Sequence, residues 1–245
     1  MEMKYTKEFT VTNNMLTKSD YIKNSSILDI AQEIAGEHAI SLHLGYDDLI
    51  KENLLWVVVR NYVEIYKPIK DIRKVLVNTY PLAPRFVEYN RDTEFFIDGN
   101  EPLLKMRSTW MIINKDTFNI ETPPIFKNME LSKGLFSSRI KRLPQIDKSL
   151  LTYDHDFKVT YSYLDHNGHM NNARYLDLFL DTYKEEGKFT KTFQVEYVKQ
   201  CFLDEVISLY KYEEDEKYYL YGYGDNGLKF YLVVTFFKED ELYEN

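Results

Sequence analysis

Hydrophobic and polar positions follow two different periods along the first half of this chain. Apolar side chains recur at helical spacing between residues 27 and 42 and form one stripe, which predicts a long helix that ends before Gly45. His38 lies on this stripe, and we interpret it as a core residue. Strand-like runs lie on either side of the helix, at about 6–13 before it and at 54–66, 73–80, 85–97 and 103–114 after it. Asp98-Gly99-Asn100 predicts a hairpin between the last two runs.

The second half repeats this order of elements. A strand at about 155–162 precedes a helix that Asn171 or Asn172 caps and that Gly187 ends, and strands at 190–200, 205–212, 217–223 and 228–237 follow. A shift of 148 residues aligns seven identical residues in 21 ungapped positions, which indicates a duplicated unit. Each unit is predicted to be an antiparallel sheet that curls around its long helix, an α+β class.

Composition narrows the classes of protein that fit. With 245 residues and 44% hydrophobic content the chain can bury one large core or two ordinary ones. The longest clear apolar run has six residues, Leu54 to Val59, so no membrane span is expected, and no apolar stretch follows Lys4 and Lys7 as in a signal peptide. The net charge of −8 argues against nucleic-acid binding, and the single cysteine, Cys201, fits a reducing cytoplasm.

A change in amino-acid composition divides the chain near residues 123–152. Pro123-Pro124 breaks regular structure, a basic stretch follows, and all seven prolines lie at or before position 144. We therefore predict an N-terminal domain at 1–122, a linker at 123–152 and a C-terminal domain at 153–245.

The run from Tyr163 to Tyr175 carries the clearest candidate chemistry. It places Asp165, Asn167 and His169 at alternate positions just before the second helix. If this run is extended, the three side chains share one face and can point into one pocket. A carboxylate, an imidazole and the free N–H groups of a helix N-terminus are parts that the hydrolysis of a carbonyl compound requires.

Plainer interpretations exist for the same residues. Asn167-Gly168 could be an ordinary hairpin turn. The pair His166 and His169, with Asp165 and the nearby 154–156 segment, could bind a metal. Cys201 could be a nucleophile, although a lone cysteine at a strand end is more often buried packing.

With these features the chain resembles the acyl-[acyl carrier protein] thioesterases of bacteria and plants, which have two hotdog domains in one chain. The resemblance covers most of the chain in family order. Its most specific block is Asp165-x-Asn167-x-His169-x-Asn171-Asn172, and it is supported by the stretches 55–60, 91–95, 107–114 and 196–201. It implies hydrolysis of the thioester between a fatty acyl chain and the phosphopantetheine arm of acyl carrier protein, with no other cofactor and no metal.

The resemblance also implies roles for residues. Asp165 and His169 would position and deprotonate water, Asn167 would hold the thioester or that water, and N–H groups near Asn171 would stabilise the oxyanion. The family commonly has glutamate at the position of Gln200; because glutamine cannot accept a proton, either Asp165 or His169 is the base, and we favour Asp165 with His169 assisting.

The first half then serves the acyl chain. The 148-residue shift aligns Thr17, Ser19 and Tyr21 with the three candidate residues, so this half lacks the chemistry and can provide a pocket. Trp56 is a candidate wall of that pocket.

Several alternatives for partner and activity stay open. Acyl carrier protein is acidic, so docking needs a local basic patch; Arg139, Lys141 and Arg142, with Lys133 and Lys148, form the densest candidate, and a solvated linker without a partner is the other interpretation. An acyl-CoA thioesterase or hydratase would share the fold, and a non-catalytic acyl-binding module is a further alternative. Acyl length is undetermined, and a homodimer is possible.

Overall fold

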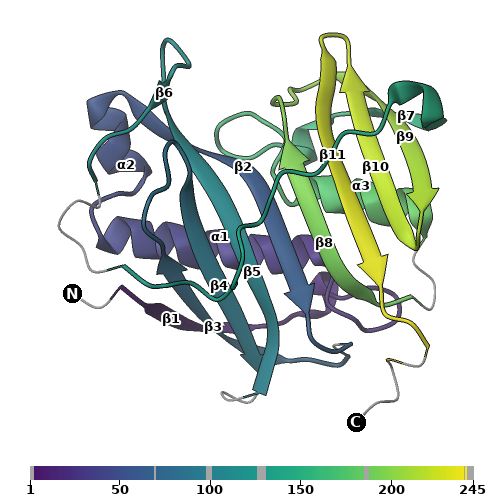
Figure 1. Cartoon of the computed structure of the whole chain (residues 1–245), viewed down its shortest axis with the longest axis horizontal. Coiled ribbons are helices and arrows are strands. Elements are labelled where there is room, and N and C mark those ends of the chain that lie inside the picture. Colours follow the sequence, from purple (N-terminus) through teal and green to yellow (C-terminus); the bar gives the residue numbers. More distant parts are fainter. Residues whose placement is uncertain are drawn as a thin grey trace.

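The two predicted units join edge to edge in one sheet (Figure 1). The computed structural model describes residues 3–68, 70–97, 101–125, 131–184, 188–239 and 241. Within these ranges eleven strands form an antiparallel sheet in the order β1-β3-β4-β5-β2-β8-β11-β10-β9-β7, with β6 paired to β5. The strands are β1 (Tyr5–Thr10), β2 (Leu54–Ile65), β3 (Lys74–Pro81), β4 (Tyr89–Ile97), β5 (Glu101–Asn114), β6 (Ile120–Glu121), β7 (Thr152–Lys158), β8 (Thr190–Tyr197), β9 (Val206–Glu214), β10 (Lys217–Gly224) and β11 (Gly227–Phe236).

Helices cover one face of this sheet (Figure 1). They are α1 (Asn24–Ser41), α2 (Tyr46–Leu49) and α3 (Arg174–Tyr183), with short 3₁₀ turns at η1 (Asn13–Met15), η2 (Ile50–Glu52), η3 (Lys148–Leu150) and η4 (Tyr161–Tyr163). The predicted stripe of α1 is buried, and it shares one continuous core with the apolar face of α3. Arg174 of α3 forms an ion pair with Asp29 of α1. The predicted fold, a sheet wrapped around a long helix in each half, is confirmed.

The order of elements is as predicted, but several ends differ. β4 begins at Tyr89 because residues 85–88 form a separate turn in which Phe86 has a positive φ of 56°. β8 ends at Tyr197 rather than at Gln200. α3 ends at Tyr183, where Lys184 takes a left-handed conformation; the predicted stop at Gly187 and the hairpin at 98–100 lie outside the described residues.

A segment from the predicted linker crosses the opposite face of the sheet. In Figure 1 this segment, residues 131–147, passes in front of strands from both halves, and we call it the strap. Leu135 N–H donates to Asp92 Oδ2 (2.6 Å), Leu143 N–H donates to Glu196 Oε1 (3.1 Å), and Ile146 N–H donates to the Tyr221 hydroxyl (2.9 Å). Because its backbone is bound to both halves, the strap is not a free, solvated linker.

Buried ion pairs of the sheet lie under the strap. Asp92 and Arg107 are directly opposite on β4 and β5 and form two hydrogen bonds of 2.6 and 2.7 Å. Arg60 and Glu196 are opposite on β2 and β8, where the two halves meet, and are 2.7 Å apart. Arg60 also donates to the carbonyl of Ile140 in the strap (3.2 Å). The sequence stretches around these residues therefore serve the attachment of the strap.

Among the described residues, no helix has both the length and the apolar character needed to cross a bilayer.

Candidate active site

The predicted catalytic residues lie on a tight turn rather than on an extended run. Leu164 and Met170 pair across this turn, Asp165 N–H donates to the His169 carbonyl (2.8 Å), and Gly168 N–H donates to the Asp165 carbonyl (3.1 Å). Gly168 has a φ of +78°, which favours glycine. The extended interpretation of residues 165–169 is therefore wrong, because these local hydrogen bonds reverse the chain. The alternative of a hairpin turn at Asn167-Gly168 is confirmed, although a helix rather than a strand follows.

The turn connects Asp165 to His169 but leaves Asn167 in solvent. Asp165 Oδ1 accepts hydrogen bonds from the backbone N–H groups of Asn167 (2.8 Å) and His169 (3.3 Å). Asp165 Oδ2 and the ring nitrogens of His169 have no hydrogen-bond partner among the described residues, and both side chains are half-buried. Asn167 is exposed. One carboxylate oxygen thus closes the turn, and the other is available to a ligand.

Residues 200–202 run beside this turn. Met170 N–H donates to the Cys201 carbonyl (2.9 Å), and His169 pairs with Phe202, whose ring lies edge-on at 5.1 Å from the imidazole. This antiparallel register places Gln200 opposite Asn171. Met170 and Cys201 are buried, whereas Gln200 and Phe202 are exposed. Gln200 therefore lies beside the turn, and its supporting role stays a prediction.

The backbone N–H of Asn171 is already occupied. It donates to the Tyr163 carbonyl (2.8 Å), so among the N–H groups near Asn171 this one is not available to an oxyanion. The Asn171 side chain instead accepts from Ala173 N–H (2.8 Å) in the turn that precedes α3. The N-cap residue of α3 is Ala173, which has no side-chain cap, so the predicted cap at Asn171 or Asn172 lies one or two residues too early. The next amide, that of Asn172, donates to no acceptor in the described ranges. Among the N–H groups near Asn171 that we expected to stabilise the oxyanion, that of Asn172 is therefore the candidate donor.

A buried lysine that sequence reasoning missed supports residues 200–202. Lys229 is 1% exposed; it donates to the Gln200 carbonyl (3.0 Å) and forms an ion pair with Glu205. Glu205 in turn accepts from Phe202 N–H (3.1 Å). The sequence does contain a signal for Lys229, because it is the single charged residue inside the apolar run 228–234. A charge in a buried strand needs a partner.

Cys201 is not suited to nucleophilic attack. Its side chain is fully buried. Burial raises the pKa of the Cys201 thiol to about 11, which outweighs the stabilising hydrogen bond from the Tyr175 hydroxyl. Since the thiolate is the nucleophile, the alternative of a Cys201 nucleophile is wrong.

The histidines of the metal alternative are separated into different contacts. His166 packs edge-on against Tyr46 of α2 at 5.7 Å, and His155 Nδ1 lies 2.7 Å from Asp154 Oδ2, with Lys211 on the other carboxylate oxygen. In the part of the chain that is described, no three His, Cys, Asp or Glu residues come together as a metal site.

The first half contains the same turn with different side chains. Leu16 pairs with Ile22, Thr17 N–H donates to the Tyr21 carbonyl (2.6 Å), and Asp20 N–H donates to the Thr17 carbonyl (3.0 Å). Thr17 Oγ1 accepts from Tyr21 N–H (3.3 Å), as Asp165 Oδ1 does from His169 N–H. Every one of these positions is displaced by 148 residues from its counterpart. The duplication inferred from sequence is thus a duplication of backbone geometry.

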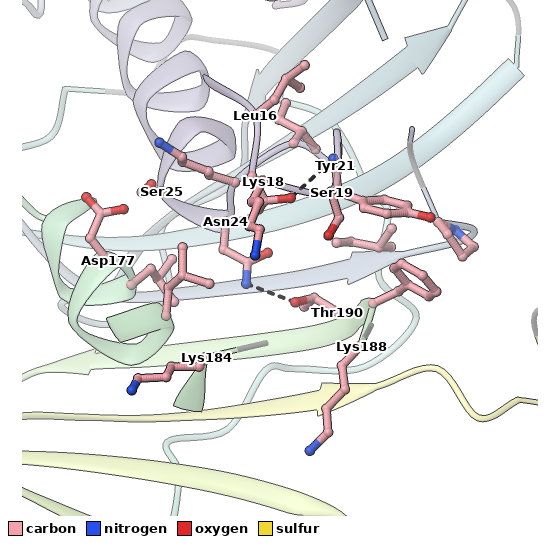
Figure 2. Close-up of a pocket in the computed structure, with 18 residues that line it drawn as sticks. Leu16, Lys18, Ser19, Tyr21, Asn24, Ser25, Asp177, Lys184, Lys188 and Thr190 are labelled. Atoms are coloured by element: carbon pink, nitrogen blue, oxygen red, sulfur yellow. Dashed lines mark hydrogen bonds between the residues drawn. The ribbon is translucent and has the colours of Figure 1, made fainter. Parts of the chain in front are cut away.

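A cavity of about 570 Å³ lies at this first-half turn (Figure 2). Thr17, Ser19 and Tyr21 line it, together with Leu176 and Leu180 of α3. The first half therefore offers space where the second half offers acid–base groups. Trp56 does not line this cavity; its indole N–H donates to the Leu44 carbonyl (3.0 Å) and its ring lies edge-on to Tyr89. The role of Trp56 in acyl binding stays a prediction.

The three predicted docking residues are exposed on the strap. Two of them have partners: Arg139 lies 2.9 Å from the Glu88 carboxylate, and Arg142 Nε donates to the Tyr231 hydroxyl (3.1 Å). The Lys141 carbonyl accepts from Gln194 (2.8 Å), while its ammonium group has no partner among the described residues.

Comparison with solved structures defines the class of fold. An acyl-ACP thioesterase from Bacteroides thetaiotaomicron superimposes with a TM-score of 0.87 at 18% identity, covering 96% of this chain and 98% of that one. The 12:0-ACP thioesterase from Umbellularia californica gives 0.84 at 19% identity, with 97% and 98% coverage. The chain therefore has the double hotdog fold.

Sequence comparison identifies the family. The acyl-ACP thioesterase N-terminal domain matches residues 2–123 and the acyl-ACP thioesterase C-terminal domain matches residues 148–229. This chain belongs to the acyl-ACP thioesterase family. It is 24% identical over 220 residues to the chloroplastic oleoyl-acyl carrier protein thioesterase of Coriandrum sativum, covering 78% of this chain and 58% of that protein. It is 27% identical over 205 residues to the chloroplastic palmitoyl-acyl carrier protein thioesterase of Arabidopsis thaliana, with 74% and 48% coverage. The chain thus spans about half of the length of these relatives.

Proposed function

We propose that this protein hydrolyses fatty acyl-[acyl carrier protein] thioesters to a free fatty acid and the carrier protein. One observation carries the proposal: the two halves have the same turn, but only the second has a carboxylate at the first position of the turn and an imidazole at the last, beside an amide that has no acceptor among the described residues. Membership of the acyl-ACP thioesterase family supports this choice of substrate. The phosphopantetheine arm belongs to that substrate, and the reaction as written uses no cofactor and no metal.

The chemistry follows from the groups on the turn. The Asn172 N–H, close to the positive end of the α3 dipole, stabilises the oxyanion that forms as water adds to the thioester carbon. Asp165 Oδ2 takes the proton of that water, and His169 holds the water in place. The carbon–sulfur bond then breaks, and the proton passes to the departing thiolate. Gln200 can only donate or accept hydrogen bonds, and Asn167, at the exposed edge, contacts the phosphopantetheine arm.

The isosteric variant Asp165→Asn tests this assignment. It keeps the Oδ1 acceptor that closes the turn but removes the carboxylate, so the turn is expected to survive while kcat falls by roughly 100-fold or more. Asp20→Asn, at an exposed aspartate of the first-half turn, is the matched control and is expected to retain full turnover. A kcat within about threefold of wild type in Asp165→Asn would exclude Asp165 as the base and leave His169.

A turnover panel decides between this function and its rivals. Acyl carrier protein and CoA thioesters of short to long acyl chains are assayed with the same enzyme. Carrier-bound substrates are expected to react faster. If CoA thioesters react at least as fast, the protein is an acyl-CoA thioesterase or another hotdog enzyme. If the folded protein binds acyl chains and hydrolyses none of them, it is the non-catalytic module that Gln200 suggests.

For the carrier protein we propose docking on the strap. The ammonium group of Lys141 has no partner among the described residues, whereas Arg139 and Arg142 are engaged with Glu88 and Tyr231. Lys141→Glu is therefore expected to lower kcat/KM on carrier-bound substrates and to leave kcat/KM on CoA thioesters unchanged. An equal effect on both, or none on either, contradicts docking at this position. We also propose a cytoplasmic location, based on the single cysteine; a homodimer stays a prediction.

A further inference from the structure

A chain of hydrogen bonds runs from the first half of the sheet to the candidate oxyanion donor. Asn61 lies on β2, opposite Val195 of β8, where the two halves meet (Figure 1). Its Nδ2 donates to the Tyr197 hydroxyl (3.2 Å), and that hydroxyl donates to the Asn172 carbonyl (2.8 Å). Asn172 is the residue whose N–H has no acceptor among the described residues. Two side chains thus connect the first half to the backbone that carries this donor.

We propose that Asn61 and Tyr197 are positioning residues for the hydrolysis of the thioester. They fix the backbone at Asn172, so that its N–H points at the oxyanion as this forms. The inference rests on the proposed function and deepens it, because it names the side chains that orient the oxyanion donor. Both act through Asn172 and not by contact with the reacting atoms.

The direction of both hydrogen bonds is determined by the Asn172 carbonyl. A carbonyl oxygen can only accept, so the Tyr197 hydroxyl donates its single proton to it. The hydroxyl oxygen then accepts from Asn61, whose Nδ2 must face it. Burial raises the pKa of the Tyr197 hydroxyl above its usual range, so the hydroxyl keeps the proton that it donates. The ring of Tyr197 lies edge-on to that of Tyr175 in α3, with the ring centres 5.4 Å apart, which holds the hydroxyl in place.

This arrangement leaves the side-chain oxygen of Asn61 unpaired. Asn61 is 1% exposed, and among the described residues its Oδ1 is the one buried side-chain nitrogen or oxygen that has no hydrogen-bond partner. A buried acceptor without a donor lowers stability, and an apolar side chain would avoid that cost. Packing of the core therefore does not explain an asparagine at this position, whereas its donation to Tyr197 does.

Tyr197 holds one of the two peptide groups that flank the Asn172 Cα. In the peptide group before this Cα, which carries the Asn172 N–H, the Asn171 carbonyl accepts from Arg174 N–H (3.0 Å). In the peptide group after it, Ala173 N–H donates to Asn171 Oδ1 (2.8 Å) and the carbonyl accepts from Tyr197. Since each peptide group is planar, holding both of them fixes the direction of the Asn172 N–H. Without the hydroxyl, the second group is held at its N–H end but not at its carbonyl.

Tyr197→Phe removes the hydroxyl and keeps the ring. On acyl carrier protein thioesters it is expected to lower kcat about tenfold and to leave KM within about twofold of wild type, because the oxyanion forms only in the transition state. Tyr183→Phe is the matched control, since its hydroxyl donates to the Tyr219 carbonyl (2.8 Å) at the far end of α3. It removes the same type of hydrogen bond, so it is expected to lower the melting temperature to a similar extent and to leave kcat unchanged.

Asn61→Leu removes the donor to Tyr197 together with the unpaired acceptor. It is expected to lower kcat about threefold, the worth of a neutral hydrogen bond, without a loss of thermal stability. A residue with a structural role alone would not combine these two results. Asn61→Leu is expected to lower kcat no further when Tyr197→Phe is already present, because Asn61 acts through the hydroxyl.

Nuclear magnetic resonance measures the hold on Asn172 without any turnover. The dipeptide Asn-Ala occurs once in the sequence, at positions 172–173. Labelling with carbonyl-¹³C asparagine and ¹⁵N alanine therefore gives one carbonyl–amide correlation, which reports on the carbonyl that accepts from Tyr197. Its ¹³C shift is expected to change in Tyr197→Phe, to change less in Asn61→Leu, and to stay as in wild type in Tyr183→Phe.

The two measurements separate this inference from the proposed function. If wild type hydrolyses the thioesters but kcat is unchanged in either Tyr197→Phe or Asn61→Leu, the inference is overturned and the proposed function stands. An Asn61→Leu effect of equal size with and without Tyr197→Phe also overturns it. A wild type without turnover refutes the proposed function, and a changed ¹³C shift then supports the hold on Asn172 independently. An unchanged ¹³C shift in both variants overturns the inference in either case.

Discussion

The junction between the two halves depends on one buried carboxylate, that of Glu196. It is 3% exposed, and its Oε1 accepts hydrogen bonds from Arg60 Nε (2.7 Å), Gln194 Nε2 (2.7 Å) and Leu143 N–H of the strap (3.1 Å). Arg60 is 5% exposed and lies directly opposite on β2. Glu196 thus connects the first half, the second half and the strap at one point.

Replacing Glu196 by alanine is expected to destabilise the protein severely. The change leaves the Arg60 guanidinium buried, and within the described ranges the Ile140 carbonyl is the one acceptor that remains for it. Removal of one partner of a buried ion pair typically costs about 3–5 kcal/mol, because the remaining charge is uncompensated. This is a large share of the roughly 5–15 kcal/mol by which proteins are stable. Arg60→Met/Glu196→Leu removes both charges, so most of that penalty disappears, and the remaining cost of about 1–3 kcal/mol comes from the unpaired Leu143 N–H.

Urea unfolding, followed by far-UV circular dichroism and by tryptophan fluorescence, measures these differences. Glu8→Gln is the control, because its ion pair with Lys74 is exposed and is worth less than about 1 kcal/mol. If Glu196→Ala costs less than about 1 kcal/mol, or if the double variant is as unstable as the single one, the pairing of these two buried charges is not what stabilises the junction.

Three further predictions concern separate sites. His38 is buried, and burial and Arg91 lower its pKa to about 4. Between pH 6.5 and pH 4 the unfolded chain therefore takes up a proton at this histidine, while the folded protein keeps it neutral. The contribution of His38 to the free energy of unfolding is fully present above pH 6.5, and about 3 kcal/mol is lost as the pH falls towards 4. Unfolding free energies at pH 7 and pH 4 are expected to differ less in His38→Gln than in wild type, and an equal difference contradicts this. The buried Cys201 thiol is expected to react with a thiol reagent only after unfolding in urea, whereas Cys201→Ser retains turnover; rapid native modification would disprove its burial. Gly168→Ala is expected to cost about 1 kcal/mol in thermal unfolding because its φ is +78°, while Asp20→Gly at the equivalent turn position is not expected to destabilise; equal effects would exclude backbone strain as the cause.

Local patterns in the sequence predicted most of the fold. The helical stripe of residues 27–42 and the runs of strand character predicted the order of elements. The reason is that the periodicity within a helix or strand determines on which face of that element a side chain lies. The 148-residue repeat predicted two equivalent units, and both turns indeed have the same hydrogen bonds. The ends of elements were less well predicted, as at residues 85–88, because turns there depend on single backbone conformations.

The sequence also identified the second-half turn as the candidate active site, but for an incomplete reason. Asp165 and His169 are connected by the Asp165 cap of the turn, not by strand alternation. The short polar run folds back on itself through its own hydrogen bonds, and its second arm pairs with Cys201 and Phe202, which are more than 30 residues away. The Tyr163 carbonyl occupies the Asn171 amide, and the amide of Asn172 has no acceptor among the described residues.

By itself, then, the sequence determined the family, the repeated unit and the half that carries acid–base groups, since all three are written in residue types and their spacing. Only the tertiary structure decided where the strap lies, which charges are buried in pairs, and which residues of the two halves line the cavity at the first-half turn. Each of these depends on contacts between segments such as β2, β8 and the strap that lie far apart in the chain. Burial, and with it the strength of every charge–charge and hydrogen-bond interaction, exists only once those segments are packed together.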